Sequence, residues 1–299
     1  MMAATFRSSV IFLLLLGACT PRGEQIVVGG KNFTEQDILG EIMAQQLERR
    51  TSLHVERKLH LGGTFVCHEA LVAGRIDVYP EYTGTALVAI LKSPPIADPV
   101  AAGGVIGRQY LERFHAEWLP PFGFDNTFAI VVRAGDARRL GIRTISDAAR
   151  FTPRWRAGFG YEFMDRADGY RGLAKLYGLR FPGPVRVMDL GLTYRALADS
   201  EVDLIAGNFT DGQIEALHLV ALEDDRRYFP SYQAAPVVSE AALRLHPGIR
   251  AALAELAGTI SDTAMRRMNY EVDVQHRSAA EVAREFLAGI GTNQPRENR

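Results

Sequence analysis

Short apolar runs alternate with segments of helical apolar spacing along most of the chain, and this alternation restricts the fold more than any other feature. In the first third, the strand-like runs are QIVVGG (25–30), LHVERKLHL (53–61) and RIDVY (75–79). Helix-like segments lie between them at 32–50 and 62–74. Strands that alternate with helices predict an α/β fold with largely parallel sheets.

The same order returns in the middle of the chain. Strand-like and helix-like segments follow one another at 154–160, 171–179, 185–190, 193–200 and 202–207. From about Ser239 the chain is expected to be helical, and Ser278 with Glu281 has the spacing of a capping box for the last helix. A length of 299 residues suggests two domains or two lobes of one fold.

Two of these units align without a gap at an offset of 126 residues. EALVAGRIDVYPEYTGT (69–85) and RALADSEVDLIAGNFTDG (195–212) share an Ala-Leu pair and then a branched residue followed by Asp, and Tyr82 corresponds to Asn208. A chance match, or the common pattern of βαβ units, is the alternative. If the equivalence is real, two similar lobes place these turns at carboxyl ends of strands, where open α/β sheets bind ligands.

The N-terminus predicts export. An apolar run at 10–16 is too short to remain as a membrane-spanning helix, so residues 1–18 are expected to be a signal peptide. The sequence LGAC (16–19) resembles the lipobox of bacterial lipoproteins. This implies cleavage before Cys19, lipidation of its thiol, a tether over 19–24, and membrane anchoring in the periplasm or at the cell surface. An ordinary signal peptide with a chance cysteine is the alternative.

Composition and motif content exclude several functions. A formal net charge of -1 provides no basic field for nucleic acid. The chain has no P-loop, no G-x-S-x-G elbow and no G-x-G-x-x-G after a strand, and its seven histidines lack paired metal-ligand spacing. We therefore expect neither an enzyme nor a metal or cofactor. Cys67 lies on an apolar helical face and is expected to be a buried thiol without a disulfide.

Two basic residues are candidates for holding a carboxylate. Lys31 follows two glycines and precedes a helix, whose N-terminus favours anions. The alternative is a plain helix cap with a solvated lysine. Arg166 lies between Asp165 and Asp168 and can bind a carboxylate through two parallel hydrogen bonds, unless it belongs to a local salt-bridge network at the surface.

Aromatic residues are placed at turns beside strands. Pro80 is expected to end a strand, after which Tyr82 and Thr85 face a site, with Tyr79 packed beneath them. A quaternary ammonium group cannot donate hydrogen bonds, so proteins hold it with the faces of aromatic rings. Core packing is the alternative for each ring. Further rings lie in PPFGFDNTFAIVV and FPSYQAAPVV, namely Phe122, Phe124, Phe128 and Tyr232.

Four parts of the chain resemble the substrate-binding proteins of osmoprotectant ABC importers, which take up glycine betaine, choline or carnitine. They are GGKNFTEQDILGEIMAQQL, LGGT…HEALVAGRIDVYPEYTGTAL, FGFDNTFAI and DRADGY…DLGLTYRAL…VDLIAGNFTDG…FPSYQAAP. KNFTEQ and YPEYTGT are typical of the family rather than of the fold. The resemblance implies a type II periplasmic-binding-protein fold, with two α/β lobes around a ligand cleft. Lobe I is expected at 25–128 and 233–292, lobe II at 129–232, and a tail at 293–299, with crossovers near 128–132 and 232–237.

Carried over position by position, the resemblance implies two groups of ligand-binding residues. The ligand carboxylate would be held by Lys31, Thr85 and Arg166. The ammonium group would lie in a box of Tyr82, Phe128, Asn208 and Tyr232. The family usually has tyrosine at the position of Phe128, so a hydroxyl is lost here. Its YSTDG motif appears as NFTDG (208–212), so Asn208 replaces a ring at a cost of up to about 2 kcal/mol, and Phe209 would point to the other side of an extended backbone.

The resemblance implies an extracytoplasmic binding protein that delivers a quaternary ammonium ligand to a permease with its ATPase. Ligand would bridge the lobes and stabilise a closed form of a monomer. Asn208 leaves two ligand hypotheses, which are weak binding of glycine betaine and binding of a different betaine with a polar ring, such as ergothioneine. A sensory module that signals to a receptor is a further alternative, and an enzyme on the same fold is another.

Overall fold

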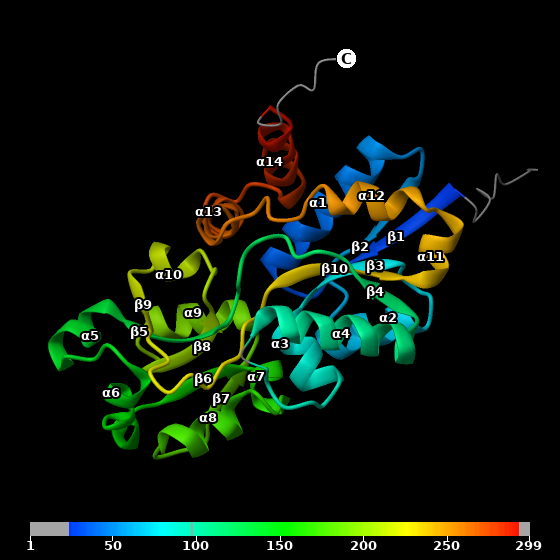
Figure 1. Ribbon diagram of the computed structural model, residues 1–299. Coiled ribbons are helices and arrows are strands. Elements are labelled where there is room, and N and C mark those ends of the chain that lie inside the picture. Colours follow the sequence, from blue (N-terminus) through cyan, green and yellow to red (C-terminus); the bar gives the residue numbers. More distant parts are fainter. Residues whose placement is uncertain (1–23, 97, 293–299) are drawn as a thin grey trace, which may run out of the picture.

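Two five-stranded sheets form the frame of the protein (Figure 1). The computed structural model describes residues 24–96 and 98–292. The first sheet has the order β2-β1-β3-β10-β4 and consists of β1 (Gln25–Gly29), β2 (His54–Lys58), β3 (Val78–Tyr82), β4 (Ala116–Trp118) and β10 (Ala234–Ser239). The second has the order β7-β6-β8-β5-β9 and consists of β5 (Phe128–Arg133), β6 (Ala157–Gly160), β7 (Arg186–Met188), β8 (Leu204–Asn208) and β9 (Leu219–Leu222).

Each sheet has helices on both faces, and we call each sheet with its helices a lobe. In the first lobe, side chains of β1 alternate, so that Ile26 and Val28 join one apolar cluster and Val27 packs against the opposite one. The helices of this lobe are α1 (Thr34–Arg50), α2 (Thr64–Val72), α3 (Thr83–Thr85), the π-helical turn η2 (Ala86–Ile90), α4 (Pro99–Phe114), α11 (Glu240–Leu245), α12 (Gly248–Ala254), α13 (Asp262–Asp273) and α14 (Ala279–Thr292).

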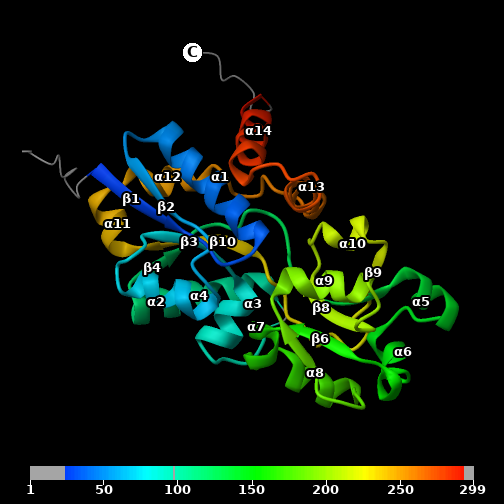
Figure 2. The same ribbon diagram turned by 180° about the vertical axis from the view of Figure 1, so that it is seen from behind.

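The second lobe repeats this layering. Along β8, Leu204 and Ala206 join one apolar cluster and Ile205 joins the cluster on the other face. Figures 1 and 2 show α13 of the first lobe beside α10 of the second, and the two helices are in contact. The helices of this lobe are α5 (Ala134–Leu140), α6 (Ile145–Ala149), the 3-10 turn η3 (Thr152–Arg154), α7 (Tyr161–Asp165), α8 (Tyr170–Tyr177), α9 (Leu190–Ala198) and α10 (Gln213–Ala216).

The sheets are mixed rather than largely parallel, which corrects the sequence-based expectation. β1 pairs in parallel with β2 and β3, but β10 pairs antiparallel with β3 and β4. In the second sheet, β5 pairs antiparallel with β8 and β9. The reason is topological: β5 and β10 each enter their sheet directly from the other lobe, without the helical crossover within one sheet that a parallel pair requires.

The internal repeat is confirmed at the predicted offset. α2 and β3 span 64–72 and 78–82, and α9 and β8 span 190–198 and 204–208, which is a shift of 126 residues in each case. Equivalent bonds hold both turns, because the backbone N–H of Val27 donates to Asp77 and that of Arg156 donates to Asp203. Two βαβ units thus place Tyr82 and Asn208 at corresponding strand ends.

Pro80 does not end its strand, contrary to the sequence-based prediction. It lies within β3 and faces Pro236 of β10. Opposite residues in an antiparallel ladder alternate between pairs that exchange hydrogen bonds and pairs that do not. Thr83 donates to the carbonyl of Gln233, so the pair formed by Pro80 and Pro236 falls in a position that exchanges none. The missing proline N–H is therefore not needed in this ladder, and the strand continues to Tyr82.

Other local predictions are confirmed. The Cys67 thiol is fully buried, and it is the free cysteine of the described residues. Burial raises the pKa of this thiol to about 12. The hydroxyl of Ser278 accepts from the backbone of Glu281, whose carboxylate accepts from the backbone of Ser278, so the predicted capping box is formed.

The predictions for both chain ends lie outside the described residues. These are the signal peptide at 1–18, the lipidated Cys19 and the tail at 293–299. Within 24–96 and 98–292, the helices are too short or too polar to cross a membrane.

We predict that Gly207→Ala destabilises the protein by about 1–3 kcal/mol. A Cβ at this β8 position would lie 1.8 Å from the hydroxyl oxygen of Tyr194. The Tyr194 ring is buried and cannot move freely. The control is Gly104→Ala on α4, where nothing lies within 4 Å. It is expected to stabilise the helix by up to about 1 kcal/mol. Urea unfolding of both variants provides the comparison, and wild-type stability of Gly207→Ala would contradict the predicted clash.

Candidate ligand-binding cleft

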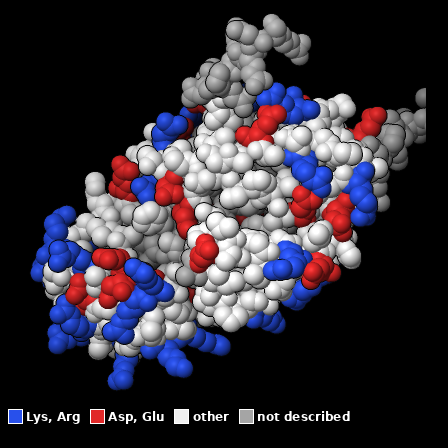
Figure 3. Space-filling model, viewed as in Figure 1, with Lys and Arg blue, Asp and Glu red and all other residues white. Residues whose placement is uncertain are grey.

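A cleft of about 300 Å³ lies between the lobes, at the ends of the two repeated strands. This volume suits a small molecule. All seven residues predicted for the site line it, including Lys31 after β1, Tyr82 at the end of β3 and Asn208 at the end of β8. The other four are Thr85, Phe128, Arg166 and Tyr232. Figure 3 shows that charges of both signs are interspersed at the end of the second lobe near α5 and α6.

Aromatic rings form much of the wall. The rings of Phe128 and Tyr232 are 5.7 Å apart and nearly perpendicular, and Phe163 lies 5.0 Å from Phe128. Across the cleft, Phe33 stacks on Tyr82 at 6.3 Å. The sequence analysis did not identify Phe33 or Phe163. The position of a ring on a helix, or just before one, does not indicate whether the ring faces a cleft.

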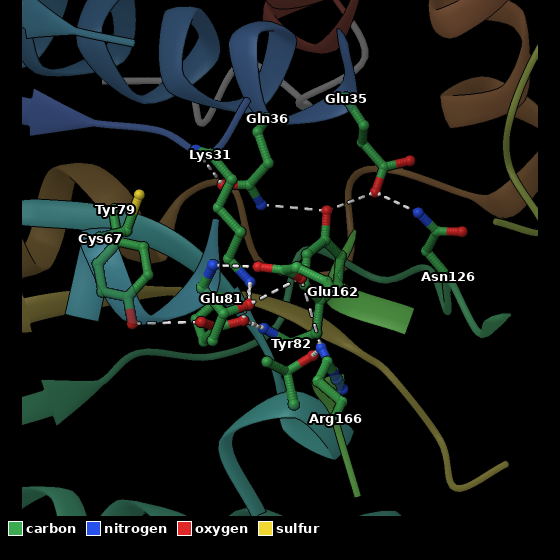
Figure 4. A network of polar contacts seen from close by, with 12 residues as sticks. Lys31, Glu35, Gln36, Cys67, Tyr79, Glu81, Tyr82, Asn126, Glu162 and Arg166 are labelled. Atoms are coloured by element: carbon green, nitrogen blue, oxygen red, sulfur yellow. Dashed lines mark hydrogen bonds and ion pairs between the residues drawn. The ribbon is translucent and has the colours of Figure 1, made fainter. Parts of the chain in front are cut away.

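The charge of Lys31 is balanced by a buried carboxylate. Its Nζ donates to Glu81 at 2.6 Å and to the Thr64 hydroxyl at 3.0 Å, and both Lys31 and Glu81 are buried. The same Nζ lies 5.1 Å from the centre of the Tyr82 ring. Glu81 also accepts from the Tyr79 hydroxyl at 3.3 Å, beneath the cleft as predicted for Tyr79. Figure 4 shows this network, whose acidic member the sequence analysis missed.

Arg166 is buried, so the alternative of a surface arginine is wrong. The local salt bridge of that alternative is nevertheless present, because Arg166 pairs with the neighbouring Asp168. It donates two bonds to Asp168, at 2.8 and 2.6 Å, and one to the Thr85 hydroxyl at 3.0 Å. Its guanidinium lies 5.0 Å from the Phe128 ring centre and 5.8 Å from that of Tyr232. These bonds use three of the five N–H donors of the guanidinium.

Glu35 of α1 connects the two lobes behind the cleft. Its fully buried carboxylate accepts from the Tyr82 hydroxyl at 2.8 Å and from the Asn126 amide at 2.8 Å. It also accepts from Thr210, in the turn after β8, and from Asn269 of α13. Burial raises the pKa of Glu35 even though these hydrogen bonds act to lower it. Glu35 belongs to the KNFTEQ sequence noted above. That sequence does not indicate that the hydrogen-bond partners of Glu35 come from four other segments.

A second acidic residue reaches across the cleft. Glu162 of α7 accepts from the backbone N–H and the hydroxyl of Thr64, at the start of α2. Its carboxylate also lies 3.9 Å from Arg166. The start of α2 is thereby covered by a carboxylate of the opposite lobe. No group of acidic, histidine or cysteine side chains suited to a metal ion occurs within the described residues.

Asn208 lines the cleft, at the position where the resemblance described above implies a tyrosine in other members. It pairs with Phe128 across the β5–β8 ladder, and its side-chain amide donates to Asp211 at 3.2 Å. Phe209 lies off the cleft, as predicted, with its ring 5.0 Å from the Arg266 guanidinium. The cleft wall therefore has a polar amide on the strand next to Phe128.

We predict that Lys31→Met destabilises the protein by about 3–5 kcal/mol, because it leaves Glu81 buried without its cation. The double variant Lys31→Met/Glu81→Gln removes both charges and is expected to recover much of this loss. Urea unfolding of Lys31→Met, Glu81→Gln and the double variant measures the coupling free energy between the two side chains. A double variant as unstable as Lys31→Met would show that the two charges do not compensate each other.

Comparisons with known proteins agree with this geometry. Residues 24–289 match the family described as the substrate binding domain of ABC-type glycine betaine transport systems. The carnitine transport binding protein of Listeria monocytogenes is 34% identical over 282 residues, which cover 92% of this chain and 91% of that protein. An ergothioneine transport permease and binding protein of Helicobacter pylori is 34% identical over 288 residues, 94% of this chain and 51% of that protein.

The fold is also found among solved structures. A crystal structure of a glycine betaine/carnitine/choline ABC transporter protein has a TM-score of 0.73 and 33% identity, and the match covers 88% of this chain and 98% of that chain. The predicted two-lobed periplasmic-binding-protein fold is confirmed, as is the prediction of a binding protein rather than an enzyme. The chain belongs to the family of substrate-binding proteins of ABC-type glycine betaine transport systems.

Proposed function

We propose that the cleft binds a betaine, with the trimethylammonium group against the aromatic rings and the carboxylate at the cationic end. The main support is that one cavity contains Arg166 and Lys31 together with the rings of Tyr82, Phe128 and Tyr232. Arg166 has N–H groups left over, and Thr85 offers a hydroxyl beside it. The ring faces provide the attraction that a group without hydrogen-bond donors requires.

The ligand bridges the lobes in this proposal. Tyr82 and Thr85 belong to the first lobe, whereas Phe128, Arg166 and Asn208 belong to the second. A ligand that contacts both lobes stabilises the closed form, because it makes more contacts in the closed form than in the open form. We propose hinges in the segments between β4 and β5 and between β9 and β10, next to the expected boundaries at 128/129 and 232/233. The closed form then docks on a permease with its ATPase.

Binding is expected to depend on the charge of the ammonium group and on the rings. We predict that glycine betaine binds at least tenfold more tightly than 3,3-dimethylbutanoate, which has the same shape with carbon in place of the charged nitrogen. Phe128→Ala is expected to weaken betaine binding about tenfold, because one ring face is lost. Isothermal titration calorimetry measures both effects.

The control for Phe128→Ala is Phe209→Ala, which removes a ring that lies against Arg266 outside the cleft. It should leave the affinity unchanged. Equal binding of betaine and the analogue that lacks the ammonium charge would show that the rings do not recognise a cation, and the proposed ligand class would be wrong.

We also propose that residues 1–18 are removed and that Cys19 is lipidated, so that the protein acts at a membrane surface outside the cytoplasm. The LGAC sequence at 16–19 supports this. Cys19→Ser is expected to move the protein from the membrane fraction to the soluble fraction of cells. The control is Cys67→Ala, which changes the buried thiol and should leave the protein with the membrane. Membrane retention of Cys19→Ser would contradict the lipid anchor.

A further inference from the structure

The side chain of Asn208 is held by Asp211, a partly buried acidic residue. Its Nδ2 lies 3.2 Å from Oδ2 of Asp211 and 3.5 Å from Oδ1. The same Oδ2 accepts from the backbone N–H of Asn208 at 3.0 Å and from the hydroxyl of Tyr194 at 2.5 Å. Tyr194 is buried in α9, and Asp211 lies in the turn that follows β8. Three donors therefore converge on one carboxylate beside the cleft.

This arrangement determines which end of the amide faces Asp211. An ionised carboxylate can only accept hydrogen bonds, and an amide donates through nitrogen and accepts through oxygen. The nitrogen of Asn208 must therefore face Asp211, which directs Oδ1 away from it. Among the described residues, none donates a hydrogen bond to that oxygen. Asn208 itself lines the cleft and is only partly buried.

We infer that Asn208 supplies a hydrogen-bond acceptor to the ammonium end of the cleft, and that the preferred ligand is a quaternary ammonium compound with an O–H or N–H donor near its charged nitrogen. This inference rests on the proposed function. Asp211 is the positioning residue, since it orients the amide without reaching the cleft lining. A ligand that has no such donor leaves Oδ1 unpaired when the lobes close, which reduces its affinity.

Titration of Asp211 provides an independent readout. Burial raises the pKa of Asp211 to about 7, and the carboxylates of Glu35 in α1 and Asp273 in α13 contribute to the rise, against the hydrogen bonds from Tyr194 in α9 and from the Asn208 backbone in β8. A protonated Asp211 can itself donate, so it no longer imposes one orientation on the amide. Preference for donor-bearing ligands should therefore be larger at pH 8.5 than at pH 6.

Two pairs of ligands, in each of which only one member has a donor near the ammonium group, test the inference by calorimetry on the purified protein. Carnitine and γ-butyrobetaine differ by one hydroxyl. Nα,Nα,Nα-trimethylhistidine and its phenylalanine counterpart differ by the ring N–H and the second ring nitrogen. At pH 8.5 we expect the donor-bearing member of at least one pair to bind about fivefold more tightly. In Asn208→Leu, which is similar in size but has no acceptor, the ratio should fall to about one.

Asp211→Asn should lower the same ratio while both ligands still bind, and it should abolish the dependence on pH. The ratio of two Kd values from one preparation does not depend on the folded fraction, so partial unfolding of a variant does not obscure the result. Equal affinities within both pairs, or ratios unchanged in Asn208→Leu, would overturn the inference and leave the proposed function intact. A wild-type ratio for carnitine and γ-butyrobetaine that is equal at both pH values would overturn the role of Asp211, because neither of these ligands has a ring nitrogen that titrates in this range. Absence of binding by all four compounds would overturn this inference, and failure of glycine betaine to bind as well would overturn the proposed function itself.

Discussion

The buried carboxylate of Glu35 is the contact on which the geometry of the cleft depends. Burying a charge is costly unless several donors replace its water shell, and here the donors come from both lobes and from the segment between them. Each donor is useful only when its segment is correctly placed. The position of the Tyr82 ring in the first lobe is therefore coupled to the turn at Thr210 in the second, two residues after Asn208.

Charge pairing inside the cleft follows the same logic. Lys31 is paired with Glu81, and Arg166 with Asp168, and all four side chains are buried. The positive charges of Lys31 and Arg166 are thus balanced by the negative charges of their partners, and the two pairs together add no net charge to the cleft. A zwitterion, whose own charges also sum to zero, can enter such a site without leaving an uncompensated charge behind. This charge balance supports the proposal of a betaine rather than a simple anion as the ligand.

The order of strands and helices, the repeat at an offset of 126 residues and the seven cleft residues could be predicted from the sequence, because apolar spacing and motif matches are local properties. The partners of those residues could not. Glu81 reads as one more polar residue between Pro80 and Tyr82, and its pairing with Lys31 spans 50 positions. The strand through Pro80 was missed for a similar reason, since a proline is tolerated there because its pair with Pro236 falls where the ladder exchanges no hydrogen bonds.

Residue type and short-range spacing were enough to predict the class of fold, the two equivalent strand ends and a polar side chain, Asn208, at one of them. Tertiary structure alone decided that both sheets are mixed, that Lys31 and Arg166 have internal counter-ions, and that Asp211 holds the Asn208 amide. These features arise when distant segments are brought together. Hydrogen-bond partners depend on distances of about 3 Å between atoms, which the linear order of residues does not specify.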